Sequence, residues 1–179
     1  VAADLLSQAE HDKNASAVLV TDSFEFAEKV SSALEKQIPE LLRSEIARAS
    51  VDNNGKIIVA EDIKEAIAVA NEIAPEHLEL CLDDPFDYLD LVKNAGSVFM
   101  GRYCPEALGD YYAGPNHTLP TGGTARFSSP LSVDDFVKKT QFTYYTKGAL
   151  SKVAQDVAFF AEKEGLTAHA KSAVIRFEE

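Results

Sequence analysis

Two short apolar segments are each followed at once by an amphipathic helix pattern, and this alternation is the strongest constraint on the fold. Residues 15–21 form a continuous apolar run that ends at Asp22-Ser23, a typical helix N-cap, and a helix pattern follows over residues 24–38. Residues 56–60 repeat the arrangement, with Asp62 as the cap of the next helix. Strand then helix, twice over, predicts a layer of parallel strands.

Other segments extend this pattern. Further strands are predicted at residues 78–82 and 97–100, with a helix at 83–92 between them. Additional helices are expected at residues 1–11 and from Pro39 to about residue 49, followed by a turn at 52–55. The fold class is therefore α/β, with a partial Rossmann-like parallel-sheet domain over residues 1–131.

A small, mainly helical tail is expected over residues 132–179. Its pattern predicts helices at 149–164 and 167–176 and permits a short strand at 141–145. A tail of about fifty residues is too small to build a good core of its own. We expect it to pack on the rest of the chain or on a second subunit.

Charge and composition exclude several partners. The net charge of −12 and the pI near 4.7 argue against nucleic acid, which selects clustered Lys and Arg. No apolar run approaches the length that crosses a bilayer, so no membrane partner is expected. The two cysteines, Cys81 and Cys104, have no CxxC spacing and predict neither a disulfide framework nor a thiolate metal site. A reducing, cytoplasmic compartment is expected.

The stretch from Gly101 to Gly123 holds five of the nine glycines and three of the seven prolines. So many positions with special backbone angles predict a long shaped loop without regular helix or strand. The loop follows the strand predicted at 97–100, and ligands of open α/β sheets bind beyond the carboxyl ends of strands. This position favours a binding or catalytic site.

The histidines are the candidate metal ligands. They are His11, His77, His117 and His169, and each has an acidic or amide residue close by in sequence. Imidazole, carboxylate and amide groups suit Zn²⁺ or a related divalent ion, but the spacing is not diagnostic and surface histidines are the alternative. Gln8 and His11 are three residues apart and would share a helix face, so that both side chains could bind one ion. The alternative is a polar helix face that only contacts solvent.

Glu76 and His77 are adjacent and follow a predicted helix. A histidine near its ordinary pKa and a buried glutamate are common proton-transfer groups, so the pair could line one pocket. Alternatively, both residues simply end the helix, where a histidine is favoured by the dipole. Neither a GxxxxGK phosphate loop nor a GxGxxG dinucleotide motif occurs.

Five ordered segments resemble the histidinol dehydrogenase family. They are APEHLEL at 74–80, NAGSVFMG at 94–101, PEALGDYYAGPNHTLPTGGTARF at 105–127, SVDDF at 132–136 and EGLTAHAKS at 164–172. The helix that bears Gln8 and His11 is similar as well, so the likeness extends over the whole chain.

The resemblance implies an activity and a set of roles. Histidinol dehydrogenases are zinc-containing homodimers that oxidise L-histidinol to L-histidine in two NAD-dependent steps. Glu76 and His77 would be the acid/base pair. The zinc ligands would be Gln8, His11, Asp110 and His169. Substrate would be contacted by these four residues together with His77, His117 and Glu164. The tail would cross to the other subunit, so that Glu164 and His169 complete the partner's site.

Family members carry a long region before the Gln8 helix, including much of the cofactor-binding part, so residues that bind NAD are not assigned. The chain begins at Val1 within a helical pattern and its only methionine is Met100, so we expect a fragment or a processed product. Loss of an initiator or a tag is the alternative. A member from a plant would belong in the plastid.

We expect the 179 residues alone not to turn over substrate. The competing hypotheses are a non-catalytic dimer module that binds metal or a small molecule, and a zinc hydrolase in which Glu76 activates water.

Overall fold

The computed structural model describes residues 1–178, and these residues divide into two compact units. The first unit is Val1–Phe136, and the second is Val137–Glu179, of which residues 137–178 are described. Each unit is considered by itself. Among the described residues, no helix is both long and apolar enough to span a bilayer.

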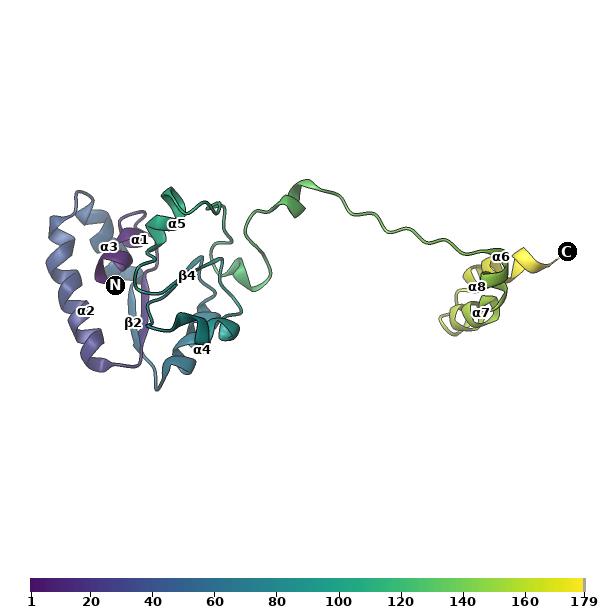
Figure 1. The fold of residues 1–179 in the computed structure, drawn as a ribbon, viewed down its shortest axis with the longest axis horizontal. Helices are drawn as coiled ribbons and strands as arrows, with labels where there is room; N and C mark the ends of the chain where they lie inside the picture. Colours follow the sequence, from purple (N-terminus) through teal and green to yellow (C-terminus); the bar gives the residue numbers. More distant parts are fainter. Residues whose placement is uncertain (179) are drawn as a thin grey trace. The chain divides into compact units, whose positions relative to one another are not determined.

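The first unit begins with three helices around a parallel strand pair. The strands β1 (Val18–Thr21) and β2 (Lys56–Val59) pair with Val18 opposite Lys56. The helix α2 (Phe24–Gln37) contacts both strands, and α1 (Ala2–Ala9) contacts α2 and α3 (Ser44–Asn54) (Figure 1). The predicted parallel pairing of these strands is confirmed.

The core of this part lies between the three helices. Leu6 is 2% exposed and Ile38 is also 2% exposed, at the start of a short 3₁₀-helix, Ile38–Glu40. The other buried members of this cluster are Ala2, Ala9, Val30, Leu34 and Ala47. Ser50 is the buried polar residue of α3. Its hydroxyl donates a hydrogen bond to the Ala15 carbonyl at 2.9 Å, so this buried polar group has a partner.

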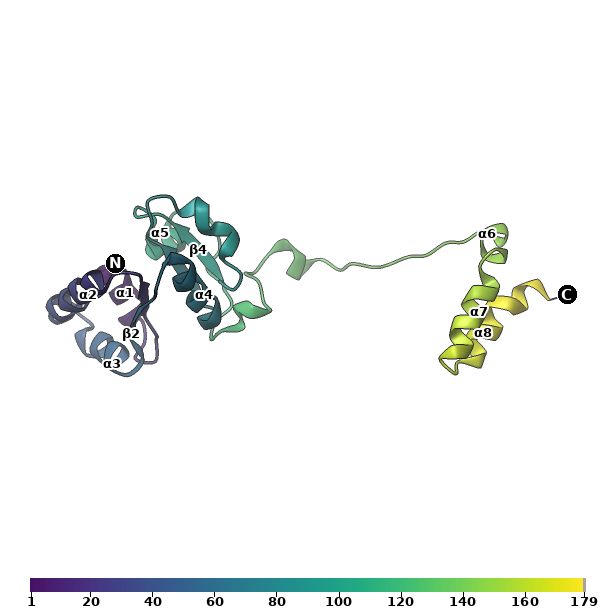
Figure 2. The ribbon, with the colours of Figure 1, turned by 90° about the horizontal axis from the view of Figure 1, so that it is seen from below.

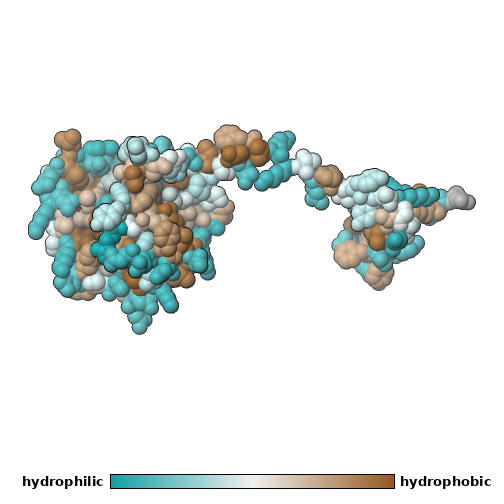
Figure 3. Space-filling model, in the orientation of Figure 1, coloured by the Kyte–Doolittle hydropathy of each residue, from teal (hydrophilic) through white to brown (hydrophobic). Residues whose placement is uncertain are grey.

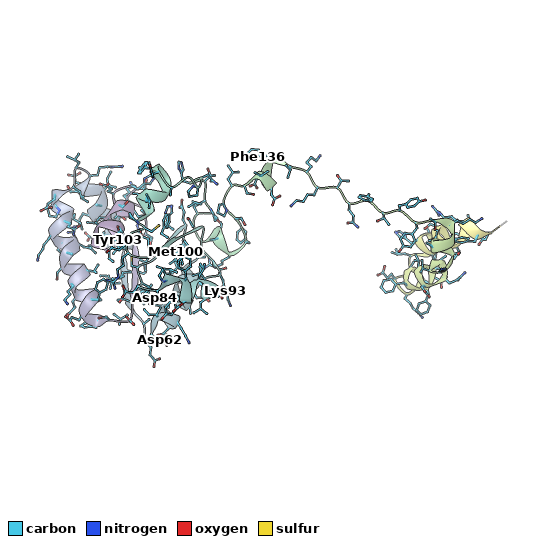
Figure 4. The ribbon with its side chains drawn as sticks, viewed as in Figure 1. Asp62, Asp84, Lys93, Met100, Tyr103 and Phe136 are labelled. Carbon is cyan, nitrogen blue, oxygen red and sulfur yellow. The ribbon has the colours of Figure 1, made fainter. Side chains whose placement is uncertain are left out.

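The second half of the first unit contains another parallel pair. The helix α4 (Ile63–Ile73) leads to β3 (His77–Leu80), which pairs with β4 (Ser97–Met100). Figure 2 shows α4 beside β4, and Figure 4 labels Asp62 at the beginning of α4 and Met100 at the end of β4. The fold class is α/β as predicted, but its strands form two separate two-stranded sheets.

Several predicted boundaries are wrong. The first helix ends at Ala9, so His11 lies in a turn beyond it and does not share a helix face with Gln8. The helix expected from Pro39 begins only at Ser44, because Pro39 lies in the 3₁₀-helix, and it continues through the predicted turn to Asn54. The helix expected at 83–92 is a 3₁₀-helix over Pro85–Leu91.

The glycine- and proline-rich stretch is not irregular throughout, contrary to expectation. It contains a short α-helix, α5 (Glu106–Tyr111), directly after Pro105. A proline is tolerated just before the first turn of a helix, where its missing N–H is not needed. The 3₁₀-helices Thr124–Arg126 and Val133–Phe136 complete the first unit. Figure 3 shows hydrophobic residues interspersed with polar ones on its surface.

The second unit is a small helical cluster. It contains α6 (Lys147–Ser151), α7 (Ala154–Lys163), α8 (Thr167–Val174) and a 3₁₀-helix, Ile175–Phe177. The single helix predicted at 149–164 is therefore interrupted, and the strand considered at 141–145 is absent from the described residues, which are exposed there. Only alanines, at 158, 161 and 170, form the buried cluster between α7 and α8.

Candidate functional site

The helix α5 presents two carboxylates one turn apart. Glu106 is its first residue and Asp110 follows four residues later, so both side chains lie on one face. Gly109 allows α5 to lie close to β4, because a Cβ at this position would be 2.6 Å from Cε1 of Phe99. Phe99 itself is 6% exposed. The contact between glycine and aromatic ring therefore fixes where the two carboxylates lie.

His77 is the first residue of β3. The preceding helix α4 ends at Ile73, and the next residue, Ala74, adopts left-handed backbone angles with φ of 52°, so that the chain turns there into Pro75 and Glu76. The His77 ring lies 5.9 Å from the Phe99 ring, centroid to centroid, and its side chain is 16% exposed. The imidazole is thus held against the same aromatic residue that supports α5.

Carboxylates flank the His77 imidazole. Its Nε2 is 4.0 Å from Oε1 of Glu76 and 4.0 Å from Oε1 of Glu106. Ligand atoms of His77, Glu106 and Asp110 all lie within 4.8 Å of one another. We call His77, Glu76, Glu106 and Asp110 the His77 cluster. A base surrounded by three carboxyl groups is an arrangement suited to proton transfer or to cation binding.

Glu106 is held from several directions. The Ser7 hydroxyl donates to its Oε2 at 3.2 Å, which connects α1 to α5. The Glu106 backbone N–H donates to Oε1 of Glu79 in β3 at 2.8 Å. Gln8 lies next to Ser7 on α1 and is half-buried. The hydrogen bond from Ser7 therefore brings the helix that carries Gln8 up to the helix that carries Asp110.

Burial changes the ionisation of the carboxyl groups. It raises the pKa of Glu106 above its ordinary value, and the hydrogen bond and charge of Asp110 raise that pKa further, while His77 and Ser7 lower it. Burial also raises the pKa of Glu79, opposed mainly by the bond from the Glu106 N–H. The interior of this site therefore disfavours a full set of negative charges.

A second polar group lies near the first. Ligand atoms of Asp4, Glu79 and Cys81 are within 4.8 Å of one another, and the Cys81 thiol donates to Oε2 of Glu79 at 3.7 Å. Burial, followed by the Glu79 charge, raises the pKa of the Cys81 thiol. A raised pKa keeps a thiol protonated, which lowers its reactivity as a nucleophile.

The structure brings together some of the sequence-predicted site residues. Glu76, His77 and Asp110 lie in the His77 cluster, and Gln8 lies on the adjacent helix. His11 and His117 are exposed in the turn and loop of the first unit. Glu164 and His169 are exposed on the second unit.

Glu106 and Ser7 were not predicted as site residues. The sequence did contain a signal for Glu106, namely its spacing of four residues from Asp110. This spacing places two carboxylates on one face only if the segment is a helix. The stretch was expected to be a loop, and the spacing therefore carried no information.

Comparison with known proteins gives one consistent result. The histidinol dehydrogenase family model matches residues 1–177. The histidinol dehydrogenase of Caldanaerobacter subterraneus subsp. tengcongensis is 62% identical over 177 residues, which are 99% of this chain and 41% of that protein. That of Bacillus cereus is 57% identical over 179 residues, 100% of this chain and 42% of that protein.

A solved structure agrees with the sequence relatives. The crystal structure of histidinol dehydrogenase from Elizabethkingia anophelis matches with a TM-score of 0.90 and 38% identity, over 99% of this chain and 41% of that one. The chain spans about two fifths of the length of the relatives it matches. The chain belongs to the histidinol dehydrogenase family.

Proposed function

We propose that this chain is the C-terminal part of an enzyme that oxidises L-histidinol to L-histidine in two steps, each coupled to reduction of NAD. The observation that carries the proposal is the His77 cluster, in which an imidazole lies 4.0 Å from each of two carboxylates, in a chain of this family. Oxidation of an alcohol requires a base for the hydroxyl proton, and a half-buried histidine is suited to that role.

His77 and Glu76 have separate roles in this proposal. In the first step, His77 accepts the hydroxyl proton of histidinol while the carbon-bound hydrogen leaves as hydride, and the product is an aldehyde. In the second step, Glu76 accepts a proton from the water that adds to the aldehyde, and a second hydride leaves to give the carboxylic acid, which releases its proton to solvent and becomes the carboxylate. NAD supplies the hydride acceptor. A base positioned in this way contributes about 10²- to 10⁴-fold to the rate.

The donor groups present suit a zinc ion. Asp110 provides a half-buried carboxylate whose oxygen lies within 4.8 Å of ligand atoms of His77 and Glu106, and carboxylate and imidazole are groups that Zn²⁺ accepts in catalytic sites. In the proposal the ion would be held by Gln8, His11 and Asp110 together with His169 of the partner subunit. Zinc bound there would orient the amine and imidazole nitrogens of histidinol. His117 and Glu164 are proposed to contact the substrate.

Residues 132–179, which include the second unit, are proposed to act as a dimer arm that supplies Glu164 and His169 to a partner subunit. Its buried cluster consists of alanines, whereas Phe159 and Phe160 are 62% and 67% exposed. A small core with exposed aromatic side chains is typical of a segment that is stabilised by contact with another surface.

The two half-reactions provide the test, in the protein that contains this chain at the length of its relatives. NAD reduction is measured with L-histidinol and, separately, with L-histidinal. His77→Gln is expected to slow the reaction of histidinol by at least about 100-fold, since it removes the base. Glu76→Gln is expected to slow the reaction of histidinal more than the oxidation of the alcohol. Glu28→Gln, an exposed glutamate on α2, is the matched control.

The outcomes separate the alternatives. No NAD reduction by the unmodified protein with either substrate refutes the proposed activity. Tight binding of zinc and histidinol without turnover indicates a non-catalytic binding module instead. Equal effects of both variants on both half-reactions contradict the separate roles of Glu76 and His77.

A further inference from the structure

Glu106 lies on α5 and contacts α1 and β3, the other two elements that carry central residues of the proposed site. We infer that Glu106 is the positioning residue of this site, holding α1 and α5 in place beside the His77 imidazole. The inference rests on the proposed function, because it concerns the geometry of that same site. It adds a residue that does not itself react with substrate.

The contacts of Glu106 converge from different parts of the chain. Its Oε2 accepts a hydrogen bond from Ser7, which is 99 residues away in sequence and next to Gln8 on α1. Its Oε1 lies 4.0 Å from Nε2 of His77 on β3. Its side chain also interacts with the Asp110 carboxyl, one turn further along α5. These contacts fix the separations between α1, α5 and His77.

The backbone of Glu106 is fixed as well. Its N–H donates to Oε1 of Glu79 at 2.8 Å, and the Glu106 side chain is only 16% exposed. The 4.0 Å separation from His77 exceeds a hydrogen bond, whereas the Ser7 hydroxyl lies within hydrogen-bond distance of the Glu106 carboxylate. Its contribution is therefore to the placement of its neighbours, and small displacements of reacting groups strongly affect rates and binding.

Truncation and isosteric replacement separate position from charge. Glu106→Ala removes the acceptor for Ser7 and opens space beside His77, and we expect kcat/KM for histidinol to fall at least tenfold, mainly through a higher KM. Glu106→Gln keeps an acceptor for Ser7 and a donor for Asp110, and is expected to stay within threefold of the unmodified protein. Ser7→Ala, which removes one contact of Glu106, is expected to lie between them. Glu28→Gln is the control.

A second readout does not depend on turnover. The rate at which diethyl pyrocarbonate labels His77, followed by peptide mass mapping in the same full-length protein, reports access to the imidazole. We expect labelling at least threefold faster in Glu106→Ala and unchanged in Glu106→Gln and Glu28→Gln. Thermal unfolding of each variant verifies that the protein remains folded at the assay temperature.

The inference is overturned if Glu106→Ala retains kcat/KM within threefold, or if His77 labelling does not change. It is also overturned if Glu106→Gln is as impaired as Glu106→Ala, because the charge would then be the decisive property. An unmodified protein without histidinol oxidation refutes the proposed function and leaves the labelling experiment to decide whether Glu106 positions His77.

Discussion

At the scale of single residues, Gly109 determines how closely α5 approaches β4. Gly109→Ala would place a Cβ 2.6 Å from Cε1 of Phe99, so the ring or the helix must move. We expect a loss of about 1–3 kcal/mol in the free energy of unfolding, as for other overpacked sites. Urea unfolding measures it. Gly148→Ala in α6 is the matched control, since its added Cβ meets nothing within 4 Å, and a loss equal to that of Gly109→Ala would contradict the explanation.

Glu79 predicts a pH dependence of stability. Burial raises its pKa in the folded protein above the ordinary value of 4.5. The folded state therefore binds more protons than the unfolded state between these two values, and the stabilisation present below pH 4.5 is lost as the pH rises through the folded pKa. Glu79→Gln keeps an acceptor for the Glu106 N–H and removes this titration.

The measurement compares Glu79→Gln with the unmodified protein by urea unfolding at several pH values. The stability of the variant relative to the unmodified protein should increase from pH 4 toward neutral pH. Glu28→Gln is measured alongside as the control substitution at an exposed glutamate. If the free energies of unfolding of Glu79→Gln and the unmodified protein differ by the same amount at every pH, this result would contradict a raised pKa of Glu79.

The sequence predicted the site residues unevenly. Glu76 and His77 could be proposed together because they are adjacent in sequence and therefore lie close together in any fold. The neighbourhood of His77 and Glu106 could not be proposed from the residues, because it depends on the packing of α5 against Phe99. The hydrogen bond from Ser7 to Glu106 joins residues 99 positions apart and depends on that packing too.

At the scale of elements, the N-cap of α4 is the clearest case of sequence determining structure. The Asp62 carboxylate accepts a hydrogen bond from the Glu65 N–H at 2.8 Å, and the predicted helix begins directly after it. Asp62→Ala is expected to cost about 0.5–2 kcal/mol of stability. Urea unfolding provides the measurement. Asp22→Ala, an exposed aspartate that immediately precedes the Ser23 cap, should cost less than Asp62→Ala.

The helices that follow the Ser23 and Asp62 caps were predicted well, whereas elements that depend on packing between distant residues were not. The cap at Ser23 is confirmed by its bond from the Phe26 N–H at 3.2 Å. The six-residue α5 was missed because its glycine opposes helix formation in isolation, while packing on Phe99 requires that glycine. Residues 141–145 have the composition of a strand, but the described chain offers them no partner strand.

At the scale of the whole molecule, strand pairing was the least predictable feature. Alternation of strands and helices predicted parallel pairs, and both pairs are parallel. The same pattern favoured one sheet, but β1–β2 and β3–β4 are separate. Apolar patterning identifies a strand, while its neighbour is selected by contacts between distant parts of the chain. The sequence therefore predicted that the strands pair in parallel, but it did not predict that they form two separate sheets.

The proposed exchange of the second unit between subunits makes a prediction that single variants cannot test. His77→Gln inactivates a site through the first unit, and His169→Ala inactivates a site through the second unit. In a mixed dimer with exchanged second units, one site combines both changes and the other contains neither. Since half of randomly mixed dimers are mixed, about a quarter of the unmodified activity should return after unfolding and refolding the two variants together.

The control for this experiment mixes His77→Gln with Glu76→Gln, which both alter the first unit and leave no intact site in any dimer. Activity recovered in the first mixture and absent in the second would show that His169 acts across the interface. If His169 instead completed the site of its own chain, each subunit of a mixed dimer would carry one defect and neither mixture would recover. Histidinol-dependent NAD reduction, measured against total protein, distinguishes these outcomes.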